Sequence, residues 1–373
     1  MNQVTLQMND TPNAQVLFVA LELSDKSWTL LFGHGGRYRE VVVPVGDVAR
    51  VANESIKARG RFGLQADAPV LSCYEAGRDG FWVHRALEAA GITNLVMDPS
   101  SIQVDRRMRR AKTDRLDVRK LLELLIRHHR GEQAFRVVAV PSRETEDVRR
   151  DARELERLKK ERTGHVNRIK SLLQLHGVRA RKIPALDEVR DWQGEPLPPV
   201  ILDELKREES RLELAQEQIE DIEALRRERL KEKLPSVLVQ KVATLSQLRG
   251  VAGTSSWLFV GEFFAWRTFR NRRQVGSAAG LTACPYDSGW SERDQGISKA
   301  GNRRVRTMAI QLAWSWLRYQ PQSALSQWFT KRFGIGKRSR RIGIVALARR
   351  LLIAFWRFVE QGVVPEGALL KAA

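Results

Sequence analysis

Cysteine is scarce in this chain, and its scarcity excludes several kinds of protein. Only Cys73 and Cys284 occur among 373 residues. Two thiols cannot build a disulfide framework or a cysteine-rich zinc site. We therefore expect a protein of a reducing compartment, the cytoplasm, in which packed hydrophobic cores hold the fold together.

Long uncharged apolar runs are also absent. The chain does not begin with a positively charged segment followed by an apolar one, so no secretion signal is predicted. The most apolar stretch, residues 342–364, is interrupted by Arg349, Arg350 and Arg357. This pattern predicts a helix packed on protein rather than a membrane span.

Acidic residues are missing from one long segment. None occurs between Gln295 and Val359, whereas lysine and arginine recur throughout it, beginning with Lys299, Arg303, Arg304 and Arg306. The whole chain has 64 basic and 44 acidic residues, a net charge of +20. A solvated helix face normally mixes signs, so a one-signed run predicts a phosphate-binding surface and a nucleic-acid partner. The alternative is a merely basic protein.

Tryptophans lie among these basic residues, at positions 314, 316, 328 and 356. At helical spacing most tryptophans belong to a core. One or two of these could instead stack on nucleic-acid bases.

Carboxylates stand in the first third of the chain where a buried side chain is expected. Glu22 interrupts the apolar run 16–23, and Glu75 ends the apolar run 70–74. Asp114 and Asp117 are three residues apart, so in a helix they share one face. Like charges in a core repel one another unless a cation neutralises them. Hard oxygen donors suit Mg²⁺, or alternatively Mn²⁺, and the pattern indicates metal-dependent phosphoryl transfer.

The hydrophobic periodicity before residue 142 alternates between strand-like and helix-like runs. We predict strands at 16–23, 28–32 and 38–45, a helix at 48–59, a strand at 69–74, a helix at 82–90, a strand at 94–97 and a helix at 113–129. This order resembles the ribonuclease H-like α/β fold, with a mixed sheet. Glu22, Glu75 and the Asp114/Asp117 pair fall where that fold carries its carboxylates.

The rest of the chain has an all-α pattern. Residues 142–240 contain two long charged helices with apolar residues at heptad spacing, which predicts a coiled-coil hairpin that pairs with itself or with another subunit. A plain helical linker is the alternative. The loop 248–253 resembles the turn of a helix-hairpin-helix, whose backbone amides can hold a phosphate. We expect a loose segment at 1–14, a catalytic domain at 15–141, the coiled-coil region at 142–240 and a C-terminal domain at 241–373.

Several strings together resemble one family, the Insertion Sequence 110 family of transposases. They are Ala-Leu-Glu-Leu-Ser at 20–24, Tyr-Glu-Ala-Gly at 74–77, Lys-Thr-Asp-Arg-Leu-Asp at 112–117, Ser-Gly at 288–289 and Gly-Ile-Ser-Lys-Ala-Gly-Asn at 296–302. The resemblance covers nearly the whole chain. It implies a RuvC-like domain with an acidic tetrad, here Glu22, Glu75, Asp114 and Asp117, followed by a C-terminal domain with a nucleophilic serine, here Ser288.

The resemblance also implies an activity and partners. Family members are recombinases that excise and insert their own element, guided by a structured noncoding bridge RNA that pairs with target and donor DNA. It implies Mg²⁺, a phosphoserine intermediate and a homodimer or homotetramer. The rival hypotheses are a RuvC-like endonuclease or junction resolvase that uses water, and a nucleic-acid-binding protein without catalysis.

The residues leave some alternatives open. The family's first carboxylate is usually aspartate, and Asp25 is the nearby aspartate, although strand alternation favours Glu22. From the residues alone, Ser288 competes with Ser277, Ser291 and Ser298. Candidate phosphate-binding residues before the Asp114/Asp117 pair are Arg106, Arg107, Arg109, Arg110 and Lys112, with a solvated loop as the alternative. Candidate RNA-binding residues, or a solvated helix face, are Lys159, Lys160, Arg162, His165, Arg168 and Lys170.

Overall fold

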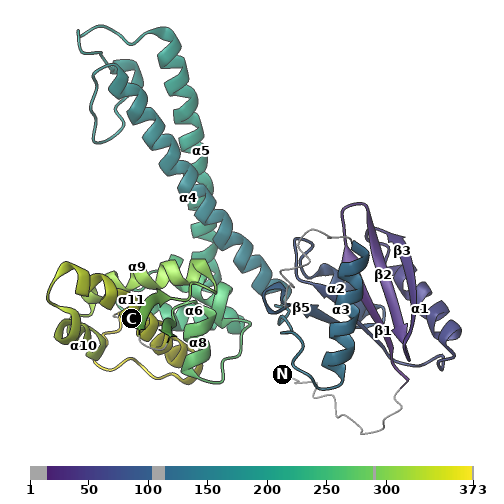
Figure 1. Cartoon of the computed structure of the whole chain (residues 1–373). Helices are drawn as coiled ribbons and strands as arrows, with labels where there is room; N and C mark the ends of the chain where they lie inside the picture. The colour runs from purple at the N-terminus through teal and green to yellow at the C-terminus, as the bar shows by residue number, and fades with distance from the viewer. Residues whose placement is uncertain (1–14, 103–113, 289–290, 372–373) are drawn as a thin grey trace. The chain divides into compact units, whose positions relative to one another are not determined.

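The computed structural model describes residues 15–102, 114–288 and 291–371. The chain divides into two compact units, residues 1–140 and 141–373, each with its own core (Figure 1).

The first unit is built on one sheet. Within the described residues its strand order is β3-β2-β1-β4-β5. The strands are β1 (Leu17–Leu23), β2 (Ser27–His34), β3 (Arg37–Pro44), β4 (Val70–Glu75) and β5 (Thr93–Met97). The first three are antiparallel neighbours, and β4 and β5 continue the sheet parallel to β1.

Helices cover both faces of this sheet. The α1 helix (Val48–Phe62) and the α2 helix (Trp82–Ala89) pack on the face that carries Leu21 and Tyr74. The α3 helix (Asp114–His129) packs on the face that carries Ala20 and Cys73. This mixed α/β unit is consistent with the ribonuclease H-like fold. Each predicted strand and helix of the unit is present, and residue 113, where the last of these helices was predicted to begin, lies outside the described residues.

The second unit begins with two long helices that run side by side (Figure 1). These are α4 (Arg143–Leu175) and α5 (Pro199–Arg229), connected by a segment that contains the short helix η3 (Leu186–Glu188). Leu155 and Leu158 of α4 pack on Ile219 of α5 in one cluster, and Ile169 packs with Leu205 in another. The two helices thus pack on each other within one chain, along the predicted apolar stripes.

The remaining helices surround α11 (Lys337–Gln361), whose Leu347, Leu351 and Phe355 are fully buried. They are α6 (Val237–Ser246), α7 (Gly253–Phe259), the π-helical turn η4 (Val260–Phe264), α8 (Arg272–Ala278), α9 (Arg303–Tyr319) and α10 (Ala324–Phe333). Strands β6 (Ala283–Ser288) and β7 (Ser291–Ile297) form a hairpin between α8 and α9. The prediction that the apolar stretch 342–364 is a helix packed on protein is confirmed.

Among the described residues, no helix is long and apolar enough to span a bilayer.

Candidate functional site

Glu22 and Glu75 lie at neighbouring positions on parallel strands. Strand β1 pairs with β4 in a register that places Leu21 beside Tyr74, so the next residues along the two strands are Glu22 and Glu75. Residues of equal register in a parallel pair point to the same face of the sheet. Side chains alternate between the two faces along a strand, so both glutamates lie on the same face as Ala20 and Cys73. The α3 helix covers this face.

The α3 helix approaches this face with its first turns toward the glutamates. The Cys73 thiol, two residues before Glu75, lies 3.7 Å from the carbonyl oxygen of Leu121, and Val118 is fully buried. Burial raises the pKa of that thiol, which acts as an apolar packing group. Asp117 is half-buried one turn before Leu121. Asp114 begins the helix one turn before Val118, and its side chain lies outside the described residues.

Asp25, the alternative to Glu22, has a different environment. It lies in the bend between β1 and β2, its side chain is 72% exposed, and it forms a salt bridge with Arg78. Glu22 is half-buried within β1 and lies opposite Thr29 of β2. The structure therefore aligns Glu22, rather than Asp25, with Glu75.

These residues fit a divalent metal by the chemistry of their donors, which are all carboxylate oxygens. Two come from adjacent strand positions and two from the first turns of the helix above them. The described residues do not include the Asp114 side chain. Among them, no three acidic, histidine or cysteine residues lie close enough together to hold a metal ion.

Ser288 ends β6 and pairs directly with Ser291, the first residue of β7. Both serines therefore lie at the closed end of the hairpin, and the two residues between them are outside the described set. The other two candidates lie elsewhere. Ser277 is exposed on α8, whereas the Ser298 hydroxyl accepts a hydrogen bond from Thr282 at 3.2 Å at the open end of the hairpin.

The Ser-Lys-Ala-Gly-Asn segment at 298–302 packs against the loop after α8. At Gly301 the two backbones are so close that no side chain would fit between them. A Cβ on Gly301 would lie 2.5 Å from the carbonyl oxygen of Ala278 and 2.6 Å from the amide nitrogen of Gly280. Lys299 has φ of 54°, alone among the described non-glycine residues in having a positive value. Arg306 holds the turn by donating hydrogen bonds to the carbonyl oxygens of Ala279 (3.1 Å) and Lys299 (3.0 Å). Glycine is required here because two backbones meet.

Asn302 connects this string to a buried ionic network that the sequence reasoning missed. Its side-chain oxygen caps α9 by accepting from the amides of Arg304 and Val305. Its side-chain nitrogen donates to Glu262 at 3.2 Å. Glu262 is 1% exposed and also accepts from Arg153 Nε of α4 at 2.9 Å. A glutamate inside the apolar run 257–264 was the sequence signal for this network.

The predicted phosphate-binding cations differ in what they contact. Arg304 forms a salt bridge with Glu156 of α4 at 2.6 Å, and Arg306 holds the Lys299 turn. Lys299 and Arg303 form no salt bridge with any described carboxylate. The basic residues at 106, 107, 109, 110 and 112 lie outside the described residues.

Five of the six candidate RNA-binding residues of α4 contact α5 or the segment that connects the two helices, whereas Lys160 is exposed. Lys159 pairs with Glu223 at 2.7 Å, and Arg168 pairs with Glu204 at 2.6 Å. His165 contacts Glu208 at 2.7 Å. Arg162 donates to the Gln216 side chain, and Lys170 donates to the carbonyl oxygen of Arg181. These contacts fix the hairpin and favour a structural role over RNA contact.

The glycine loop between α6 and α7 is bound to the C-terminal segment. The Arg249 amide donates to the carbonyl oxygen of Leu369, and the Val251 amide donates to that of Leu248. Lys371 Nζ donates to the carbonyl oxygens of Ser246 and Val251. Two amides of the predicted phosphate-binding turn thus have internal acceptors.

Comparison with known proteins identifies the family of this chain. A family model described as "Transposase IS116/IS110/IS902 family" matches residues 242–327, and a DEDD transposase model of the IS110 group matches residues 17–177. "Putative transposase y4rJ" of Sinorhizobium fredii is 41% identical over 95% of this chain and 94% of its own length. "Putative transposase y4qE" of the same organism is 29% identical over 68% of this chain and 60% of its own length. The chain therefore belongs to the IS110 family of transposases, and its activity is that of a DNA transposase or recombinase.

Proposed function

We propose that Glu22, Glu75, Asp114 and Asp117 form the metal-binding part of this recombinase and that Ser288 is its nucleophile. The Ser288 Oγ–phosphorus bond forms as the bond from phosphorus to one deoxyribose oxygen breaks. That oxygen leaves with its electron pair and takes a proton. The serine proton passes to solvent, and no histidine lies near Ser288 in the sequence. A new DNA end then reverses the step, so bond energy is conserved without an energy cofactor.

The observation that carries this proposal is the shared register of Glu22 and Glu75 under the first turns of α3. Two glutamates at adjacent positions on one sheet face repel each other, and a divalent cation removes that cost. When bound, Mg²⁺ or Mn²⁺ would polarise the scissile phosphate and offset the charge that develops on it. Lys299 and Arg303, which form no salt bridge with a described carboxylate, are available to bind the phosphate.

The direct test is a denaturing gel after incubation with labelled DNA of the element's own ends. The wild-type protein should become covalently attached to a strand, and Ser288→Ala should bind DNA without forming this adduct. Ser291→Ala is the matched control, because it removes the hydroxyl of the cross-strand partner in the same hairpin. Free DNA ends without an adduct would instead indicate hydrolysis by water, as in a junction resolvase. An adduct formed by Ser288→Ala would exclude this serine.

We further propose that a structured bridge RNA guides the reaction to donor and target DNA, and that the working particle is a homodimer or homotetramer. The net charge of +20 supports a polyanionic partner. Sequencing the RNA that copurifies with the protein tests the first point. Recombination that survives complete RNase treatment of the purified protein would contradict it.

A further inference from the structure

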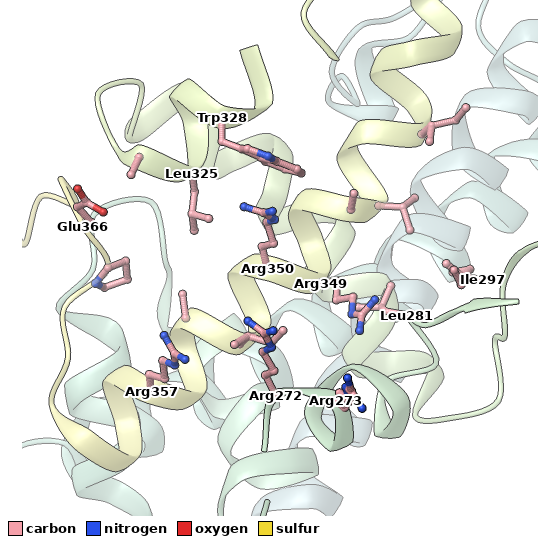
Figure 2. A pocket seen from close by; sticks show the side chains of 18 of the residues that line it. Arg272, Arg273, Leu281, Ile297, Leu325, Trp328, Arg349, Arg350, Arg357 and Glu366 are labelled. Atoms are coloured by element: carbon pink, nitrogen blue, oxygen red, sulfur yellow. The ribbon is translucent and has the colours of Figure 1, made fainter. Parts of the chain in front are cut away.

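A groove of about 1480 Å³ lies between α8, α10, α11 and the C-terminal segment of the second unit. Seven arginines and Lys299 line it, and Glu366 is its one acidic lining residue among the described residues. None of these eight basic groups forms a salt bridge with a described carboxylate. Figure 2 shows that these arginines come from two helices, with Arg272 and Arg273 on α8 and Arg349, Arg350 and Arg357 on α11.

A second pocket of the same unit shows that such a charge excess is not general. It has a volume of about 880 Å³ and lies along α4. Its basic residues alternate with acidic ones, and Arg157 pairs with both Glu154 and Glu161. That pocket has five basic and three acidic lining residues, whereas the larger groove has eight basic lining residues and one acidic one, so most of the charge of the groove lacks a counter-charge in its lining.

The groove also offers apolar and aromatic surface. Leu325, Val345 and Ile353 are among its lining residues. The guanidinium carbon of Arg350 lies 3.9 Å from the centre of the Trp328 ring, so the planar group is stacked on the indole (Figure 2). Arg350 is exposed, and its free face is a platform on which a further planar group can stack.

We propose that this groove binds an unpaired segment of DNA, with phosphates on the arginines and bases against Arg350, Trp328 and the apolar residues. The inference rests on the recombinase function, whose chemistry requires opened DNA strands. The groove residues changed in its test are not among those proposed to act in catalysis. Duplex DNA keeps its bases stacked inside and would use only the cations, leaving the platform empty.

DNA is favoured over RNA by the lining itself. A ribose 2′-hydroxyl requires an acceptor for its proton when it leaves water. Among the side chains that line the groove, Glu366 is the one carboxylate, and the others are mainly cationic or apolar. Deoxyribose fits this lining without an unsatisfied hydroxyl group.

The test measures binding to the full-length protein by fluorescence anisotropy over a range of salt concentrations. The probes are 15-mers of one sequence as single-stranded DNA, single-stranded RNA and duplex DNA. Each phosphate contact with a single strand contributes about 0.7 to the slope of log K against log salt. The double variant Arg350→Gln/Arg357→Gln removes two such contacts. It should therefore reduce the magnitude of the slope for single-stranded DNA by about 1.4.

Arg207→Gln/Arg227→Gln is the matched control, since it removes two exposed α5 arginines that form no salt bridge with a described carboxylate. It should leave the slope for single-stranded DNA almost unchanged. An equal loss of slope in both double variants would mean that net charge alone binds the DNA, and it would overturn the proposal.

Trp328→Leu tests the platform while keeping an apolar group beside Phe333, which contacts the indole ring. Single-stranded DNA should bind about 5- to 100-fold more weakly, with an unchanged salt slope and unchanged duplex affinity. Equal weakening for duplex DNA would overturn the stacking role. RNA bound as tightly as DNA of the same sequence would overturn the assignment to DNA.

Folding and catalysis are separable from this test. Removing like charges should offset the loss of the Arg350–Trp328 contact, so Arg350→Gln/Arg357→Gln should keep the wild-type melting temperature without DNA. Lost binding then cannot be ascribed to unfolding. Ser288→Ala should retain wild-type binding to single-stranded DNA even if the proposed covalent step proves wrong.

Discussion

Glu262 is the residue whose substitution should most clearly reveal how the second unit is held together. Its carboxylate accepts hydrogen bonds from Arg153 of α4 and Asn302 at the start of α9, and Arg149 Nε lies 3.4 Å from Oε2. Glu262→Gln keeps the size of the side chain but removes the negative charge. Arg149, whose side chain is 18% exposed, then loses its nearest anionic partner in a position where water compensates poorly.

The expected loss of stability in Glu262→Gln depends on how deeply the ion pairs are buried. Removing one partner of a buried ion pair costs about 3–5 kcal/mol, and we expect about 3 kcal/mol because the Arg153 side chain is 45% exposed. In a unit of this size about 1 kcal/mol corresponds to 2–4 °C, so the melting temperature should fall by roughly 6–12 °C.

The pH dependence gives a second readout. Burial raises the pKa of Glu262, but the hydrogen bond and charge of Arg153, the charge of Arg149 and the Asn302 hydrogen bond outweigh burial and lower the pKa overall. A lowered pKa in the folded state gives stability above the unfolded value, about 4.3, which is lost as the pH falls through the folded value. The difference in the free energy of unfolding between wild type and Glu262→Gln should therefore be largest at pH 7 and should shrink below about pH 4.

Thermal unfolding followed by calorimetry and circular dichroism measures both effects. The matched control is Glu156→Gln, which breaks the Glu156–Arg304 pair that likewise connects α4 to α9. Because both of those side chains are exposed, the control should cost about 0–1 kcal/mol. If Glu262→Gln lowers the melting temperature no more than Glu156→Gln does, the buried network does not stabilise the unit as argued.

Three further outcomes are expected. Glu22→Asp should retain recombination, whereas Glu22→Gln should lower the rate more than about 100-fold in Mg²⁺, as measured with the element's own ends; a tolerated glutamine would exclude Glu22 as a ligand. Gly301→Ala should destabilise the protein by about 2–4 kcal/mol because its Cβ would overlap backbone atoms, whereas Gly164→Ala within α4, where the Cβ meets nothing, should stabilise it by about 0.5–1 kcal/mol. Mixing Asp114→Ala and Ser288→Ala proteins should restore recombination if one subunit's serine acts at another's metal site; verified mixed oligomers without activity would refute this.

The elements of the first unit could be predicted closely because each is specified by the pattern of residues within its own short segment. Alternation along β1 and β4 fixes which residues face each helix layer, and a glutamate within such a run is conspicuous. The same alternation separates Glu22 from Asp25, whose bend position and pairing with Arg78 agree with the prediction. The sequence could not show that Glu22 and Glu75 share a register, since strand pairing depends on contacts between distant segments.

The second unit was harder to predict because its charged residues find partners far along the chain. Arg153 and Glu262 are 109 residues apart, and no periodicity connects them. Arg306 was predicted to bind phosphate, yet its guanidinium group closes the Lys299 turn. A run of basic residues shows how much charge is present, but only the fold shows which cations are neutralised within the chain.

The distribution of acidic residues explains where this protein is free to bind polyanions. Along α4, cations face carboxylates of α5, and Lys159 and Arg168 are each paired there. Beyond Gln295 the sequence supplies no carboxylate until Glu360, and arginines such as Arg350 and Arg357 form no salt bridge with a described carboxylate. Unpaired cations crowded in one groove repel each other, and bound phosphate relieves that repulsion. The absence of acidic residues in the last helices is therefore a functional feature, because it leaves the charge of the groove available to DNA.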